Sequence, residues 1–174
     1  ALGRTLTAAL ILANDMKNEE DRISIQIRSE GEIGNVVAEA NGKNEVKGFV
    51  TNPDVVMPPR ADGKIDVGGA LGHSGTLTIM KDIGLKEPYV GTVELVSGEI
   101  AEDISYYYAQ SEQIPTVLGL GVLVAEDPSQ DISVLSAGGY MIQLLPDAPD
   151  FIIDKIEENV RKLPKSVSAH FAEG

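Results

Sequence analysis

The chain has 174 residues, of which 43% are hydrophobic, and this is enough to bury one hydrophobic core. Its formal net charge of −13 disfavours nucleic acid and anionic membrane surfaces as partners, because both are bound mainly through Lys and Arg. The lack of cysteine and the presence of only two histidines exclude disulfides, thiolate zinc sites and His-rich metal sites within these residues.

The first part of the chain predicts a helix followed by antiparallel strands. Ala1–Lys17 is rich in Ala and Leu and apolar on nearly every face, which predicts a helix packed between layers. Strict alternation in Arg22–Arg28 places three isoleucines on one face of a strand. Asn35–Ala40 and Glu45–Thr51 predict a hairpin with a two-residue turn at Asn41-Gly42, because Asn-Gly tolerates the positive φ of such turns.

The middle of the chain predicts a loop and two further strands. Three prolines between Thr51 and Arg60 exclude a central strand, because proline has no N–H to donate, and they predict an extended loop. Gly68-Gly69 interrupts the chain again. Thr76–Asp82 and Tyr89–Val96 then carry strand-forming Val, Ile, Thr and Tyr.

The last part of the chain predicts two helices and a pair of strands. The ranges are Glu99–Gln113 for a helix, Thr116–Ala125 and Ile132–Leu145 for paired interior strands, and Pro149–Leu163 for a helix. Pro115 should end the first helix, Glu126–Gln130 should form the turn between the strands, and Asp147 should cap the second helix. The predicted fold is α+β, with mostly antiparallel sheets covered by three helices, in a single domain over residues 1–164 that is followed by the start of a linker at 165–174.

Two glycine motifs resemble functional loops but lack a required residue. Gly119-Leu120-Gly121 lacks the third glycine of a dinucleotide-binding fingerprint, because Val124 occupies that position. Gly72-His73-Ser74-Gly75 lacks the last glycine of a nucleophile elbow, because Thr76 follows. We therefore expect a close backbone approach or a bulge at the first motif and a plain turn at the second.

Glu99, Glu102 and Asp103 place several carboxylates on one helical turn. Such a group can ligate a metal or supply an acid/base pair, which leaves a small carboxylate-dependent hydrolase as an alternative. The simpler explanation is that carboxylates at the start of a helix interact favourably with its dipole. We predict no catalytic residue, no metal site and no cofactor in this chain, and so no enzyme.

Two groups of side chains are candidates for a protein-binding surface. The loop around Met57 is apolar where polar residues are usual, although packing over a sheet edge also explains it. Three consecutive tyrosines on a helix point about 100° apart, so at least one leaves the core while two can be buried. The predicted binding residues are Val55, Val56, Met57, Tyr106, Tyr107 and Tyr108.

Long stretches of the sequence resemble one known family. They are ALGRTLT at Ala1–Thr7, GKIDVGGALG at Gly63–Gly72, TLTIMKDIGLKEPYVG at Thr76–Gly91, VELVSGEIAEDISYYYAQSEQIPT at Val93–Thr116, LGLGVLV at Leu118–Val124 and AGGYMIQLLP at Ala137–Pro146. Together they cover nearly the whole chain. They resemble the redox-regulated heat-shock holdases, also called heat-shock protein thirty-three or thirty-three-kilodalton chaperonin.

The resemblance implies an ATP-independent cytoplasmic chaperone that binds unfolding proteins under oxidative and heat stress. Full-length members of that family have an N-terminal core, a helical linker and a C-terminal module whose four cysteines bind zinc when reduced and form disulfides when oxidised. The activated protein dimerises. The resemblance therefore implies unfolded client proteins and a second copy as partners, with zinc only in a module that this sequence lacks.

The sequence departs from the family pattern in three places. The opening strand of the family core is missing before Ala1, so we expect the chain to be truncated at its start, and the linker and zinc module are missing after Gly174. The connection Asp127–Ser133 is longer than the tight turn expected in the family.

The favoured interpretation is a holdase core that offers apolar area to damaged proteins, with Thr116–Leu145 as its most apolar stretch. Without cysteine, this chain should not respond to peroxide. The alternatives are the hydrolase named above and a structural dimerisation domain that binds no clients.

Overall fold

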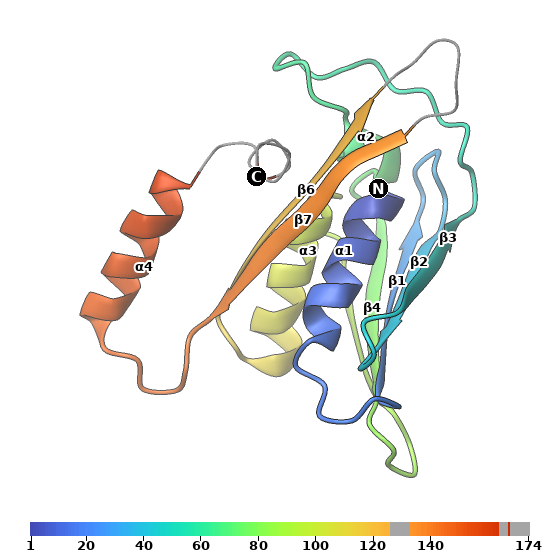
Figure 1. The fold of residues 1–174 in the computed structure, drawn as a ribbon. Helices are drawn as coiled ribbons and strands as arrows, with labels where there is room; N and C mark the ends of the chain where they lie inside the picture. The colour runs from blue at the N-terminus through green and yellow to red at the C-terminus, as the bar shows by residue number, and fades with distance from the viewer. Residues whose placement is uncertain (126–132, 164–166, 168–174) are drawn as a thin grey trace.

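The computed structural model describes residues 1–125, 133–163 and 167, and it is an α+β arrangement of two antiparallel sheets and four α-helices (Figure 1). In chain order the elements are α1 (Leu2–Ala13), β1 (Arg22–Ser29), β2 (Val36–Asn41), β3 (Val46–Val50), α2 (Val67–Leu71), β4 (Gly75–Asp82), β5 (Tyr89–Glu94), α3 (Ile100–Tyr107), the π-helix η1 (Tyr108–Glu112), β6 (Thr116–Ala125), β7 (Ser133–Gln143) and α4 (Asp150–Lys162). The predicted fold class is confirmed. None of the described helices combines the length and the apolar character needed to cross a bilayer.

The larger sheet has the strand order β3-β2-β1-β4-β5. Its central strand β1 follows the predicted alternation, because Ile23, Ile25 and Ile27 are all fully buried on the inner face. Helix α1 packs on that face through small side chains such as Ala8 and Ala9, which let the helix approach the sheet closely. Figure 1 shows α1 between this sheet and the second one, so the prediction of a helix packed between layers is confirmed.

The second sheet is a ribbon of two strands, β6 and β7, which pair in the predicted antiparallel sense. One face of the ribbon packs on α1 and α3. The prediction of interior strands is wrong, because within the described part of the ribbon Leu118 is the one buried hydrophobic side chain. A two-stranded ribbon with one covered face leaves its other side chains partly exposed. The predicted turn at Glu126–Gln130 and the Asp127–Ser133 connection lie outside the described residues, apart from Ser133 at the start of β7.

Two glycine-based predictions need correction. The β2–β3 turn is longer than two residues, since the Asn41 N–H donates to the Glu45 carbonyl and the positive φ of 61° falls on Asn44. Gly42 is required for a different reason, because a Cβ there would lie 2.1 Å from the Asn18 carbonyl oxygen. The second correction concerns Gly68-Gly69, which lies inside helix α2 instead of breaking the chain.

The helix boundaries also differ from the prediction. Helix α1 ends at Ala13, before Lys17. Helix α3 ends at Tyr107 and continues as the wider π-helix η1, which stops where Gln113 adopts a left-handed conformation (φ 56°, ψ 32°). The residue before α4 is Pro149, so Asp147, with a φ of 62°, does not cap that helix.

Helix α4 forms where predicted, but it does not cover the sheets. Figure 1 shows it set apart from the rest of the molecule, and none of its described side chains is buried. The segment before it contains Pro146 and Pro149 around the left-handed Asp147, and this turns the chain away from the ribbon. The prediction of three covering helices is therefore wrong for α4.

Candidate functional site

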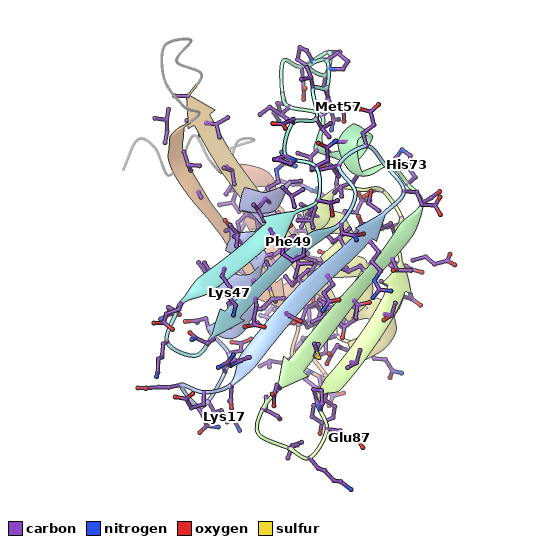
Figure 2. All side chains as sticks on the ribbon, turned by 90° about the vertical axis from the view of Figure 1, so that its right-hand side faces the viewer. Lys17, Lys47, Phe49, Met57, His73 and Glu87 are labelled. Carbon is purple, nitrogen blue, oxygen red and sulfur yellow. The ribbon has the colours of Figure 1, made fainter. Side chains whose placement is uncertain are left out.

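The outer face of the five-stranded sheet is free of other elements within the described residues. Figure 2 looks onto this face, with Lys47 and Phe49 labelled, and no described helix or strand lies in front of it. Side chains alternate between the two faces of a strand, so the burial of Ile23, Ile25 and Ile27 on the inner face places Ser24 and Gln26 on the outer one. The registers of the other strands extend this assignment across the whole sheet.

Two neighbouring rows on this face meet in an uncharged area. The first row crosses all five strands through the partners Phe49, Val37, Gln26, Thr78 and Thr92. In the second row, Ser24 of β1 pairs with Met80 of β4, which pairs with Val90 of β5. These eight residues form the uncharged band, in which Ser24 is itself buried at 6% exposed. Phe49 and Val90 are 57% and 59% exposed, so both ends of the band present apolar surface.

Charged residues border the band and pair with one another. The carboxylate of Glu39 lies 3.2 Å from the Lys47 ammonium and 3.6 Å from the Arg22 guanidinium. On the other side of the band, Arg28 and Glu94 flank Thr76 in register. Within the band the Thr78 and Thr92 hydroxyls are hydrogen-bonded at 2.9 Å. The band is therefore a neutral surface enclosed by charges of both signs.

A polar cluster lies behind the band, on the inner face of β4 and β5. The Lys81 ammonium is 2.8 Å from the Glu112 carboxylate and 5.2 Å from the centre of the Tyr108 ring. The Tyr107 hydroxyl donates to the same carboxylate at 3.2 Å. Burial, and then the negative charge of Glu112, raise the pKa of both tyrosines far above its usual value, so both stay neutral.

Two of the three carboxylates at the start of α3, those of Glu99 and Asp103, have structural partners, and the third, Glu102, is exposed. Glu99 is bonded to the guanidinium of Arg4 at 2.7 Å and to that of Arg60 at 3.1 Å. One oxygen of the buried Asp103 accepts hydrogen bonds from the N–H groups of Val96 and Ser97, which holds the turn between β5 and α3. In the part of the chain that the structure describes, no group of three His, Asp or Glu side chains is placed to hold a metal ion.

The predicted binding residues fall into two separate places. Met57 lies beside Gly69 of α2, near the start of β4, and Val56 in the same loop is 89% exposed. Tyr107 and Tyr108 lie beside Lys81, at the end of β4, and both are buried, while Tyr106 is 37% exposed. The structure therefore does not bring the two groups together. Val55 and Met57 are half-buried, and the role of all six residues in binding stays a prediction.

The two glycine motifs have structural roles. Gly119 lies beneath the ring of Tyr140 on the opposite strand, where a Cβ would be 2.4 Å from a ring carbon. Its carbonyl also approaches Gly139 closely, as expected for a glycine pair that lets backbones meet. His73 and Ser74 are exposed between α2 and β4, in the turn that the sequence predicts.

Sequence reasoning missed the uncharged band, because its members come from five strands. A partial signal was present in the polar residues that alternate with the isoleucines of β1. Their neighbours on β2 to β5 follow from strand order and register, which no local pattern contains.

Comparisons with known proteins agree on one family. The family model described as Hsp33 protein matches residues 1–173. A 33 kDa chaperonin of Clostridioides difficile (strain 630) is 49% identical over 174 residues, which are 100% of this chain and 58% of that protein. A 33 kDa chaperonin of Thermoanaerobacter sp. (strain X514) is 48% identical over 163 residues, which are 94% of this chain and 54% of that protein.

A solved structure gives the same result. The crystal structure of the 33 kDa chaperonin from Thermotoga maritima, a heat shock protein 33 homolog, matches with a TM-score of 0.88 and 41% identity. The match covers 99% of this chain and 57% of that one. The chain thus spans little more than half the length of the relatives it matches.

Proposed function

We propose, since the chain belongs to the Hsp33 protein family, that it forms the core of an ATP-independent holdase, which binds unfolding proteins and prevents their aggregation under heat and oxidative stress. The observation that carries this proposal is the uncovered, uncharged band on a chain with a net charge of −13. A holdase needs apolar surface for clients and charge elsewhere to stay dispersed.

The band fits the client-binding role better than the ribbon does. Neighbouring strands lie roughly 4.8 Å apart, so a band across five strands is on the order of 20 Å wide. The ribbon has two strands and offers a narrow face. Partly collapsed clients expose irregular apolar patches, and a broad neutral surface can contact these without selecting one sequence. Its mixture of apolar and hydroxyl side chains keeps each contact weak and therefore reversible.

We extend the proposal to the whole protein in four respects. The protein acts in the cytoplasm, it works as a homodimer, and it changes no chemical bond in its clients. Redox control and zinc binding belong to a module outside these residues, because this sequence has no cysteine that could ligate zinc or form a disulfide.

The test compares two matched double variants of this chain. Phe49→Ser with Val90→Ser removes two exposed apolar side chains from the band, and Val117→Ser with Leu135→Ser does the same on the ribbon. We expect the band variant to need about fivefold more chain to halve light scattering from heat-unfolded malate dehydrogenase, because the two lost contacts together remove about 1 kcal/mol of apolar burial. The ribbon variant should behave as the parent. If the ribbon variant loses suppression of light scattering and the band variant keeps it, the band is not the client-binding site.

A second measurement tests the assignment of redox control. The same light-scattering assay is run with and without peroxide. This chain should give the same suppression in both conditions. A strong peroxide response would show that a redox switch lies within these residues.

A further inference from the structure

The outer edge of β5 has no partner strand in the described parts of the chain. The Leu95 N–H donates to the Gly75 carbonyl at 3.0 Å, and hydrogen-bonded residues alternate along an antiparallel pair. Gly91 and Val93 therefore share this orientation toward β4. It follows that the N–H and C=O groups of Val90 and Thr92 point to the free edge of the sheet.

These two residues also belong to the uncharged band. Val90 ends one of its rows and Thr92 ends the other. A strand added beside β5 would bond to the main chain of both residues. Its alternate side chains would then lie next to Val90 and Thr92 and continue the band by one strand. The backbone edge and the band surface are thus two parts of one possible binding site.

The β5 edge lacks the usual protection against strand addition. Sheet edges in native proteins are commonly blocked by Lys, Pro or a bulge, and within β5 the stretch Tyr89–Val93 contains no charged residue and no proline, with Pro88 just before it and Glu94 at its end. The opposite edge differs. Strand β3 carries Lys47, and its free main-chain groups belong to residues that face inward, where a Cβ on Gly48 would lie 3.0 Å from the Leu6 side chain of α1.

We infer that the β5 edge binds an extended, uncharged segment of an unfolding client as a sixth strand of the sheet. The inference rests on the proposed function and specifies the conformation of the bound client. Recognition through main-chain groups needs no particular sequence, only alternating uncharged side chains and unpaired amides, which unfolding proteins expose. An uncharged client segment suits the uncharged stretch Tyr89–Val93, and a second copy bound at this edge is a separate outcome of the test below.

The probe for this inference is a short extended peptide, acetyl-(Val-Thr)3-amide with a polyethylene glycol tag for solubility. Thr92→Pro removes one edge N–H without touching the β4–β5 ladder, and Thr92→Val removes the hydroxyl but keeps that N–H. Val46→Pro makes the same change on the β3 edge as a matched control. Binding is measured by fluorescence anisotropy, and amide hydrogen exchange of the parent is followed by NMR with and without peptide.

We expect Thr92→Pro to weaken peptide binding at least about fivefold, the equivalent of one main-chain hydrogen bond. Thr92→Val and Val46→Pro should bind within about twofold of the parent, and the peptide should slow exchange at Val90 and Thr92. The exchange measurement on the parent needs no variant, so a poorly folded Thr92→Pro leaves the inference testable.

Three results would overturn the inference. The first is equal peptide binding by Thr92→Pro and the parent. The second is slowed amide hydrogen exchange that is confined to the ribbon. The third is a dimer that forms without peptide and that Thr92→Pro abolishes, because a second copy would then be the occupant. Suppression of client aggregation by the parent distinguishes a failure of the strand-addition inference from a failure of the proposed function. If the parent suppresses client aggregation but the peptide does not bind at the β5 edge, only the strand-addition inference fails.

Discussion

Replacing Gly91 with alanine tests how the end of α3 packs against β5 on the inner face of the sheet, behind the band. A Cβ at Gly91 would lie 2.5 Å from the hydroxyl oxygen of Tyr107 and 2.7 Å from its nearest ring carbon. The ring cannot easily move, because Tyr107 is 3% exposed and its hydroxyl is bonded to Glu112. Gly91 is not among the positive-φ glycines, so alanine meets no backbone penalty there and the clash alone decides the outcome.

Overpacking of this kind destabilises a protein by about 1–3 kcal/mol. The lower chain entropy of alanine in the unfolded state offsets roughly 0.5 kcal/mol of that loss. We therefore expect a net loss of about 1–2 kcal/mol, or about 2–8 °C in Tm for a chain of this size. Gly3→Ala is the control, because its Cβ meets only the Val122 side chain at 3.2 Å and alanine favours helix α1 by about 1 kcal/mol.

The assay is thermal and urea unfolding followed by circular dichroism. Gly91→Ala should lower stability, and Gly3→Ala should leave it unchanged or raise it. In a Tyr107→Leu background the loss from Gly91→Ala should shrink by about 1 kcal/mol, since the clashing ring is gone. A Gly91→Ala variant as stable as the parent, or a loss that the Tyr107→Leu background does not reduce, would refute this reasoning.

Two further predictions concern charged groups. In a chain that begins with a free ammonium at Ala1, burial, followed by the nearby Arg4 guanidinium, lowers the pKa of that ammonium from 8.0 to about 6. The folded state thus disfavours the charged form, and the free energy of unfolding should rise by about 2 kcal/mol from pH 6 to pH 8. Urea unfolding at both pH values checks this, and N-terminal acetylation should remove the contribution; an acetylated chain with the same pH dependence would contradict it. Glu99→Gln breaks the pairs with Arg4 and Arg60 and should destabilise the chain by about 1 kcal/mol at low salt and by less in 1 M NaCl. A loss that salt does not change would show that ion pairing is not its cause.

Local patterns were sufficient for most helices and strands. The isoleucines of β1 alternate with polar residues, and this period sets both the strand and its buried face. The prolines after Thr51 exclude a central strand wherever that segment lies in the fold. In α4, Ile152, Ile156 and Val160 recur at helical spacing. In each case the information is carried by residues within a few positions of one another.

Tertiary packing decided where the local predictions fell short. The apolar sequences of β6 and β7 predict burial, but the ribbon has one covered face and its other side chains stay partly exposed. Glycine is needed at position 42 because the Asn18 carbonyl approaches it closely. This contact joins two separate segments, so the local turn pattern does not predict it. The predicted tyrosine group divides as expected into two buried side chains and one exposed, yet which tyrosine is exposed depends on the contacts of Tyr107 and Tyr108 with β4 and β5.

By itself, the sequence determined the α+β class, the inward face of β1 and the family resemblance, because these depend on short-range periodicity and on long identical phrases. Only the tertiary structure decided that α4 stands apart and that Phe49, Val37, Gln26, Thr78 and Thr92 form one row. The physical reason is that strand order and register are chosen by burial over the whole sheet. A row across five strands therefore has no counterpart in any stretch of adjacent residues.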